Sequence, residues 1–309
     1  MTETIYLAAS SDDNYAQHVG VMLQSLLRNT QTPESICCYL ISCGISTENQ
    51  QFLHDVANKF NAQLHIVPTD ESKYQNLPTL RYGIAAYQRL LLPDYLPDNI
   101  EKVIYLDADT LVLDDIRKLW TIDLTGKPLG AVENLSPKAC KNLGFKRTEY
   151  FNSGMLVIDL IRWRQQNIYK RTLAFIRENL HKLRYFDQCA LNYIFFGQWH
   201  KLPLRWNQQA DIYGVLKKYA QGCGYSTDEL RQAITHPGIV HFIGEQKPWM
   251  LNCFHPFKKH YRHYLQQTPW AGRPFTDEST SQRIKHIFSI KKHWRQWCRQ
   301  RGISENENL

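Results

Sequence analysis

The sequence predicts an α/β protein with a mostly parallel central sheet, helices on both faces, and a small, basic, largely helical extension at the C-terminus. Short apolar runs alternate with amphipathic helical patterns over about the first 250 residues, which is typical of βαβ units. Residues 102–106 (KVIYL) read as a buried strand because they are β-branched and uncharged between their ends. From about residue 257 the composition becomes basic and aromatic. We therefore expect one domain over residues 1–256 and an extension over 257–309.

Each element follows from its local pattern. An apolar run that ends in the turn-forming residues SSDDN predicts the first strand, and apolar side chains at helical spacing predict the helix after it. The last predicted helix should stop before Pro93, since proline disrupts a helix interior. The expected elements are a strand over 4–9, a helix over 14–28, a strand over 35–42, a helix over 47–60, a strand over 63–67, a helix over 83–92 and a strand over 102–106.

The composition limits the class of protein. Of 309 residues, 43% are hydrophobic and 21% charged, so the chain can bury a core and global disorder is excluded. The net charge of +8 favours anionic partners such as nucleotides, phosphorylated glycans, anionic membranes or nucleic acid. Eight cysteines form neither a CxxC pair nor a zinc spacing, which favours a reduced, cytoplasmic chain. Neither a cleaved signal peptide nor a transmembrane helix is expected.

The end of the chain has its own pattern. Residues 283–301 contain seven Lys/Arg and no Asp/Glu, mixed with apolar side chains such as Ile287, Phe288 and Trp294. This pattern predicts a basic amphipathic tail that lies on an anionic membrane surface. The alternative is a solvated helix that packs its tryptophan side on the body of the protein. Nucleic-acid binding is not expected, because no recognised reader motif accompanies the charge.

The sharpest local feature is the pair of carboxylates, Asp107 and Asp109, that follows the strand at 102–106. If extended geometry continued, residues i and i+2 would project to the same side. Converging carboxylates are costly unless a cation neutralises them, and Mg²⁺ or Mn²⁺ prefers such oxygen ligands. The alternative is a pair of solvated turn residues.

A second chemistry also uses the sequence DxDxT. Haloacid-dehalogenase-type phosphatases use its first Asp as a nucleophile, on their first strand and with an acidic pair far downstream. Here three predicted strands precede the motif, and Asp114 and Asp115 follow it too soon. The phosphatase is therefore the weaker alternative.

Five motifs together resemble glycosyltransferase family 8, in order and approximate separation, over residues of about 4–250. The most similar members are bacterial galactosyl- and glucosyltransferases that build lipopolysaccharide outer chains. Aspartate pairs alone are common, whereas HxxGxxKPW is specific. The motifs are DDNY at 12–15, YLDAD at 105–109, FNSG at 151–154, DQ at 187–188 and HFIGEQKPW at 241–249.

The resemblance implies an A-type nucleotide-sugar transferase fold, Rossmann-like, with residues 1–256 as the catalytic domain. It also implies that Asp107, Asp109 and His241 bind one Mn²⁺ (or Mg²⁺) that holds both phosphates of a UDP-sugar. The imidazole favours Mn²⁺. Lys247 would pair with the diphosphate and stabilise the charge that builds on the leaving UDP, and Gly244 would permit close backbone approach.

The same resemblance places other residues around the donor. Tyr15 would stack on uracil while Asp12 and Asn14 meet the base or ribose, although these polar residues also suit a helix cap. This turn is one residue longer than the family pattern. Arg89 would reach the donor sugar and phosphate, or else be an exposed helix arginine. The implied donor-binding residues are Ala8, Asp12, Asn14, Tyr15, Arg89, Asp107, Ala108, Asp109, Asn152, Ser153, Gly154, Asp187, Gln188, His241, Gly244 and Lys247.

The family retains anomeric configuration, and Asp187, Gln188 and Lys247 are its implied catalytic residues here. Asp187 would bind sugar hydroxyls and Gln188 would lie near the anomeric carbon. Some relatives carry an acid directly after this glutamine, where the present chain has Cys189. We therefore favour front-face attack over a covalent intermediate, and expect Cys189 to be buried.

The acceptor side is less clear in the sequence. Glu133 or Asn134 falls where relatives present an acid to the acceptor, and residues 135–150 and 208–225 are predicted covering loops. The expected reaction moves galactose or glucose from UDP-galactose or UDP-glucose to a lipid-linked oligosaccharide, the lipopolysaccharide or lipooligosaccharide core. The expected location is the cytoplasm, peripherally on the inner membrane. The alternative from another class is a non-catalytic module that binds a glycan or a nucleotide sugar.

Overall fold

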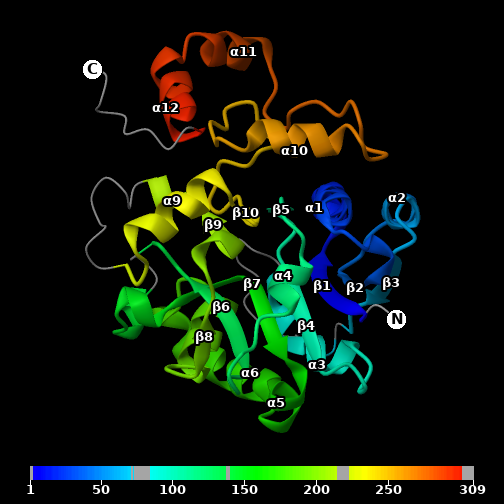
Figure 1. Cartoon of the computed structure of the whole chain (residues 1–309), viewed down its shortest axis with the longest axis vertical. Helices are drawn as coiled ribbons and strands as arrows, with labels where there is room; N and C mark the ends of the chain where they lie inside the picture. Colours follow the sequence, from blue (N-terminus) through cyan, green and yellow to red (C-terminus); the bar gives the residue numbers. More distant parts are fainter. Residues whose placement is uncertain (1–2, 71, 73–83, 137–139, 214–222, 301–309) are drawn as a thin grey trace.

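A computed structural model describes residues 3–70, 72, 84–136, 140–213 and 223–300, built on a twisted seven-stranded sheet (Figure 1). Strand β7 runs antiparallel to both of its neighbours, and the other neighbouring strands pair in parallel. The predicted α/β class with a mostly parallel sheet is thus confirmed. In spatial order the strands are β3 (Gln63–Pro68), β2 (Ile36–Ser42), β1 (Ile5–Ser11), β4 (Lys102–Leu106), β7 (Phe151–Asp159), β6 (Leu129–Glu133) and β8 (Trp199–Lys201).

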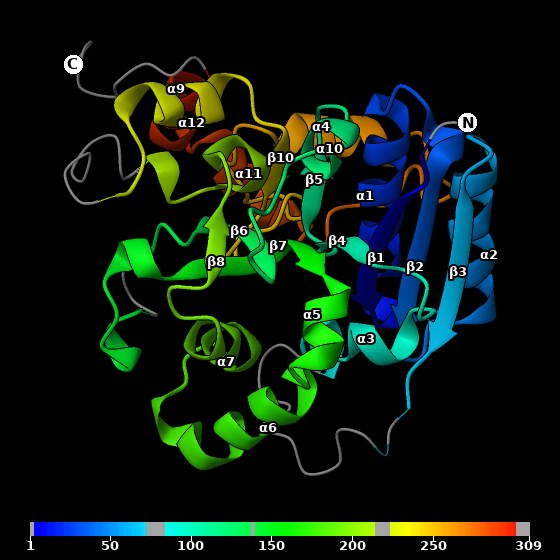
Figure 2. The ribbon, with the colours of Figure 1, turned by 60° about the horizontal axis from the view of Figure 1, so that its bottom comes forward.

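Each face of the sheet buries its own core, because successive side chains of a strand point to opposite faces. In β4, Ile104 and Leu106 face one core and Val103 and Tyr105 face the other. Helices α1 (Ala16–Asn29) and α2 (Thr47–Asn58) cover the first face. Helices α5 (Leu160–Gln165), α6 (Ile168–Asn179) and α7 (Phe186–Ile194) cover the second, and lie below the sheet in Figure 2.

The remaining helices are short. The α-helices are α3 (Leu92–Tyr95), α4 (Arg117–Trp120), α9 (Thr227–Thr235), α10 (Lys258–Leu265), α11 (Thr280–Ile287) and α12 (Ile290–Gln300). The 3₁₀ helices are η1 (Asp13–Tyr15), η2 (Pro33–Ser35), η4 (Ile84–Leu91), η5 (Cys140–Leu143), η6 (Arg147–Glu149), η7 (Leu180–Lys182) and η8 (Leu204–Asn207).

A second, three-stranded sheet lies beside the first and was not foreseen from the sequence. Its strands are β5 (Thr110–Val112), β10 (Ile239–His241) and β9 (Gln208–Gln209), in the order β5-β10-β9. His241 is opposite Thr110 on one side and Gln209 on the other. This pairing brings the end of β10 to the turn that follows β4.

The predicted strands and the helix at 47–60 are confirmed within two residues, but two helix predictions need correction. The segment expected as a helix over 14–28 begins with η1 and continues as α1 from Ala16. The helix expected over 83–92 is the 3₁₀ helix η4, with residue 83 outside the described part. This 3₁₀ helix ends at Leu91, before Pro93 as predicted, but α3 follows directly and has Pro93 in its first turn. Proline is tolerated there because a first-turn N–H has no intrahelical partner.

The C-terminal region packs on this framework and forms the orange-to-red end of Figure 1. Helix α10 lies against α1, where the Tyr264 hydroxyl and the Asn29 amide are 2.7 Å apart. The helical character of the basic tail is confirmed by α11 and α12. In α12 the Cys298 side chain is buried and the Gln296 amide donates to the His255 carbonyl. The domain boundary near residue 257 stays a prediction.

In the described part of the chain we find no helix whose length and hydropathy would let it cross a bilayer. In and directly after α11, by contrast, Ile284, Ile287 and Phe288 are 52%, 67% and 75% exposed. The tail therefore combines buried contacts in α12 with exposed apolar side chains around α11.

Trp270 ties the C-terminal region to α1 and α2. It is 1% exposed, its indole N–H donates to Asn49 Oδ1 at 3.0 Å, and its ring occupies the space that a Cβ of Gly20 would need. We expect Trp270→Ala to lower the free energy of unfolding by about 3–5 kcal/mol, since it leaves a large cavity. Urea denaturation measures this, with Phe288→Ala as the exposed control. Equal midpoints for the two variants would contradict the assignment.

His18 of α1 is a buried neutral histidine. Its ring stacks on Trp249 with 3.5 Å between centroids, Nδ1 lies 2.6 Å from the Tyr261 hydroxyl, and burial lowers the pKa of His18 to about 3. In the unfolded chain the His18 imidazole takes up a proton near pH 6.5, whereas in the folded chain it stays neutral at that pH. His18 therefore lowers the free energy of unfolding by up to about 1.4 kcal/mol per pH unit as the pH falls from 6.5 towards 3.

We expect His18→Asn to flatten the dependence of unfolding free energy on pH, measured by urea denaturation between pH 7 and pH 5. The test compares the slopes of unfolding free energy against pH, so a low overall stability of the variant would not affect it. An unchanged slope would show that His18 takes up a proton in the folded state.

Candidate active site

Asp107, Asp109 and His241 form a cluster at the carboxyl end of β4. Each offers one ligand atom, and these atoms lie within 4.8 Å of one another. His241 Nε2 is 3.1 Å from Asp109 Oδ1 and 3.7 Å from Asp107 Oδ2. Two carboxylates and one imidazole nitrogen form a donor set that suits Mn²⁺.

The two carboxylates converge through a turn, not through a continued strand. Strand β4 ends at Leu106, and the Thr110 N–H donates to the Asp107 carbonyl at 3.2 Å. The condition of continued extended geometry is therefore not met, although the two carboxylates still converge. The second sheet then aligns His241, because the Phe242 N–H donates to the Asp109 carbonyl at 3.0 Å.

Gly154 makes room for the cluster. A Cβ at this position would lie 2.1 Å from His241 Cε1 and 2.6 Å from Asp107 Oδ2, so only glycine fits. Asn152, Ser153 and Gly154 are the second to fourth residues of β7, as expected for a strand entrance, and the alternative of a simple turn is wrong.

Two cations compensate the acidic groups. The Arg89 guanidinium lies 2.8 Å from Asp107 and 3.0 Å from Asp187, and Lys247 Nζ lies 2.5 Å from Asp109 Oδ2. Arg89 is 5% exposed, so the alternative of an exposed helix arginine is wrong. Although burial acts in the opposite direction, Lys247 and His241 hold the pKa of Asp109 well below its usual range. Burial raises the pKa of Asp187 despite the neighbouring Arg89.

Asp187 and Gln188 begin α7, which points them at the start of β7. The Ser153 N–H donates to Gln188 Oε1 at 3.0 Å, and Gln188 Nε2 donates to the Tyr150 hydroxyl at 3.3 Å. Both ends of the Gln188 amide are thus oriented. Cys189 is fully buried, as predicted, with its Sγ 3.1 Å from the Tyr150 hydroxyl.

The segment at 12–15 lies at the end of β1, near Lys247. Asp12 Oδ1 accepts the Tyr15 N–H at 3.1 Å, so Asp12 caps η1 as the capping alternative predicts. Tyr15 is 40% exposed, and its ring meets that of Trp249 edge to face at 5.7 Å. Asn14 is exposed and Ala8 is buried in the core of the second face.

Two other residues that are predicted to lie at the sugar donor have no polar side chain. Ala108 is half-buried in the turn between the two carboxylates. Gly244 has a φ of 84°, a left-handed conformation that favours glycine. It follows His241 by three residues and precedes Lys247 by three, so this turn places both side chains beside Asp109.

Glu133 is fully buried and contacts residues of both predicted covering loops. Its carboxylate accepts from Arg147 Nε at 3.2 Å and from the Gly224 N–H at 2.8 Å, and Lys201 Nζ lies 3.4 Å away. The neighbouring Asn134 accepts from the Asn152 amide at 3.4 Å. Residues 137–139 and 214–222 of these loops lie outside the described residues.

Two side chains of the cluster were missed by the sequence analysis. The Tyr105 hydroxyl donates to Asp107 Oδ1 at 3.1 Å, and Asn207 Oδ1 lies 3.0 Å from His241 Nδ1. Asn207 belongs to none of the five motifs, and Tyr105 begins the motif YLDAD, in which no role is predicted for the tyrosine. The Asn207 contact arises only when distant segments meet, so no sequence signal identifies it. Tyr105 lies only two residues before Asp107, so its contact has a local signal in the sequence.

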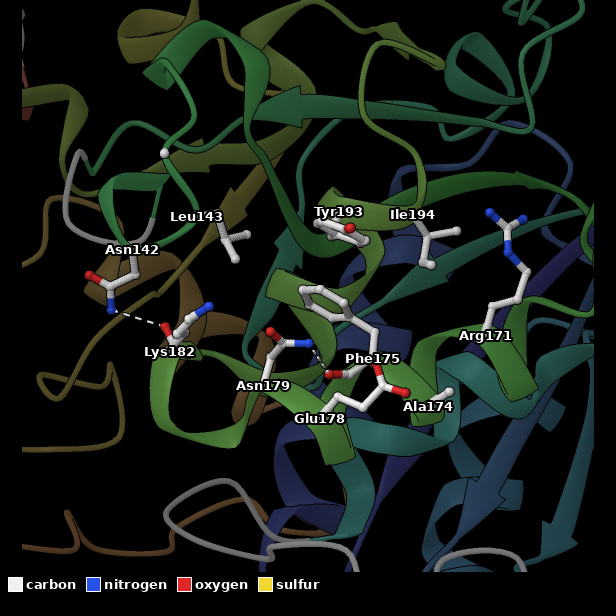
Figure 3. A pocket seen from close by; sticks show the side chains of 11 residues that line it. Asn142, Leu143, Arg171, Ala174, Phe175, Glu178, Asn179, Lys182, Tyr193 and Ile194 are labelled. Carbon is white, nitrogen blue, oxygen red and sulfur yellow. Dashed lines mark hydrogen bonds between the residues drawn. The ribbon is translucent and has the colours of Figure 1, made fainter.

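A separate surface cavity of about 850 Å³ lies between α6, α7 and η5 (Figure 3). Phe175 stacks on Tyr193 there, with 4.0 Å between ring centroids. No residue of the Asp107, Asp109 and His241 cluster lines this cavity. The convergent charged and amide groups at the end of β4 therefore remain the candidate active site.

Comparison with known proteins finds relatives over most of the chain. The chain is 36% identical over 280 residues to general stress protein A of Bacillus subtilis, covering 88% of this chain and 97% of that one. It is 26% identical over 306 residues to a lipopolysaccharide 1,2-glucosyltransferase of Escherichia coli, covering 95% and 85%. The structure of the galactosyltransferase LgtC with donor and acceptor sugar analogues superposes with a TM-score of 0.74 at 24% identity, covering 91% and 100%.

The LgtC superposition confirms the A-type fold, and the family match removes the support for the phosphatase alternative. The model of glycosyl transferase family 8 matches residues 6–253, which include every residue of the candidate site. This chain belongs to glycosyltransferase family 8.

Proposed function

We propose that this protein transfers galactose or glucose from UDP-galactose or UDP-glucose to a glycan acceptor, with metal dependence and retention of anomeric configuration. The observation that carries the proposal is the convergence of Asp107, Asp109 and His241 next to Lys247. A non-catalytic sugar-binding module does not require a metal site with a lysine directly beside it.

Asp107, Asp109 and His241 would hold Mn²⁺ (or Mg²⁺), which when bound neutralises charge on the diphosphate of the donor. The fit rests on the donor set and on the space that Gly154 leaves for the His241 ring. Lys247 lies close enough to Asp109 to bind the same diphosphate and to stabilise the charge that develops on the departing UDP. Tyr15, which is partly exposed at the end of β1, would stack on uracil.

Asp187 and Gln188 would bind the hexose. Arg89 contacts both Asp187 and Asp107, so the sugar-binding and phosphate-binding parts of the site share one cation. Gln188 Oε1 accepts a backbone N–H, and Cys189 offers no carboxylate. This arrangement favours front-face attack over a covalent intermediate, with a donor phosphate oxygen taking the acceptor proton. Its direct test is the trapping of a glycosyl-enzyme, which we expect to fail.

The proposed acceptor is a lipid-linked oligosaccharide, the lipopolysaccharide or lipooligosaccharide core. Relatives named lipopolysaccharide 1,2-glucosyltransferase and lipopolysaccharide 1,3-galactosyltransferase, at 26% and 23% identity, support this class. The exposed apolar side chains around α11, among Lys and Arg residues, support peripheral attachment to the cytoplasmic side of the inner membrane.

The first test is UDP release from a panel of nucleotide sugars with and without Mn²⁺. We expect one UDP-hexose to be turned over only with metal, and Asp109→Ala to lower the rate at least about 100-fold, since charge stabilisation in the transition state is lost. Asp98→Ala removes a fully exposed carboxylate and is the matched control. Metal-independent release, or an active Asp109→Ala, would exclude the proposed site.

Membrane attachment has a separate test. We expect deletion of residues 283–309, and the double change Ile287→Glu with Phe288→Glu, to reduce sedimentation with anionic phospholipid vesicles. UDP release should stay unchanged in the double variant, because both side chains lie on the surface. Unchanged sedimentation of both variants would rule out the tail as the attachment site.

A further inference from the structure

A row of buried side-chain amides lies behind His241, on the side away from Asp109. Asn207, at the end of η8, is fully buried between His241 and Asn152. Its Oδ1 lies 3.0 Å from His241 Nδ1, and its Nδ2 lies 2.9 Å from Asn152 Oδ1. Asn152 is itself 6% exposed. None of the five sequence motifs contains Asn207.

The hydrogen bonds in this row can run in only one direction. The Gly154 backbone N–H lies 3.0 Å from Asn152 Oδ1 and can only donate, so the atom facing it must be the amide oxygen. The Asn207 atom that contacts this oxygen must therefore be the NH₂ group. The other end of Asn207, which faces His241, is then an oxygen and can only accept.

The tautomer of His241 follows from this sequence of bonds. Because Asn207 Oδ1 accepts, His241 Nδ1 must carry a proton. In the neutral ring the lone pair is then on Nε2, which is the nitrogen that faces Asp107 and Asp109. A backbone N–H in β7 thus determines, through two amides, which imidazole nitrogen is available as a ligand.

We propose that Asn207 is a positioning residue that holds His241 in the Nδ1-protonated tautomer and thereby makes Nε2 a metal ligand. This inference rests on the metal site of the proposed function. Partners of this kind fix both the tautomer and the ring orientation of a ligating histidine. Their loss lowers metal affinity by about 10–100-fold.

The position of Asn207 supports a specific role. It directly precedes β9, whose parallel pairing with β10 places Gln209 opposite His241. The His241 ring is also confined on another side, where a Cβ on Gly154 would overlap it. Ring orientation and tautomer are therefore set by two different neighbours, Gly154 by shape and Asn207 by hydrogen bonding.

The first measurement is ¹⁵N NMR of the His241 ring in the wild-type protein with Mg²⁺ and UDP. We expect a protonated Nδ1 and an Nε2 without a proton. A proton on Nε2 and none on Nδ1 would overturn the proposal, and this result needs no variant to fold.

The second measurement is Mn²⁺ affinity in the presence of UDP, from the electron paramagnetic resonance signal of free Mn²⁺. Asn207→Leu keeps the size of the side chain without an acceptor, and we expect its Kd to rise about 10–100-fold. Asn207→Asp keeps an oxygen opposite Nδ1 but loses the NH₂ group that donates to Asn152 Oδ1, so we expect a smaller rise in Kd than for Asn207→Leu. Gln24→Met removes a buried amide far from the site and should change nothing.

These outcomes separate the inference from the proposed function. Wild-type affinity in Asn207→Leu, or equal losses in Asn207→Leu and Asn207→Asp, would overturn the role of Asn207 and leave the metal site intact. A wild-type protein that binds no Mn²⁺ with UDP would overturn both. Thermal melting of each variant shows whether it is folded. If Asn207→Leu does not fold, the ¹⁵N NMR spectrum of the wild-type protein and the Mn²⁺ affinity of Asn207→Asp decide whether Asn207 has this role.

Discussion

The repulsion between two carboxylates at the end of β4 is the constraint on which the site depends. Asp107 and Asp109 stay close because Arg89, Lys247 and His241 surround them. Arg89 lies in η4, whereas His241 and Lys247 come from the end of β10 and the turn after it, so neutralising the pair requires that distant parts of the domain be assembled. Arg89 also forms an ion pair with Asp187, which holds Asp187 close to Asp107.

The two sheets explain how these parts meet. The antiparallel β7 starts where β4 ends, and it therefore delivers Asn152, Ser153 and Gly154 to the carboxylates. The small sheet pairs β10 with β5 and β9, which brings His241 beside the turn and Asn207 behind the ring. Backbone pairing thus sets the coarse geometry. Hydrogen bonds from buried amides then set the orientation of the reacting groups.

The C-terminal region has two kinds of surface. Trp270 and α10 bury apolar area against α1 and α2, and they stabilise the same helix whose His18 stacks on Trp249 of the motif at 241–249. Around α11, large apolar side chains remain exposed among cations. Buried contacts that stabilise the fold and exposed apolar side chains thus lie in neighbouring but different segments.

Periodic and local features were determined by the sequence itself. The uncharged, β-branched run at 102–106 predicted a buried strand, and the combined motifs predicted the family and the A-type fold. The aspartate pair predicted a cation site. The 3₁₀ helix η4, the turn between Asp107 and Asp109, and the contact between Asn207 and His241 were decided only by the tertiary structure. A single buried amide such as that of Asn207 has no periodicity or spacing to reveal it, because its partner is defined by which distant segments pack together.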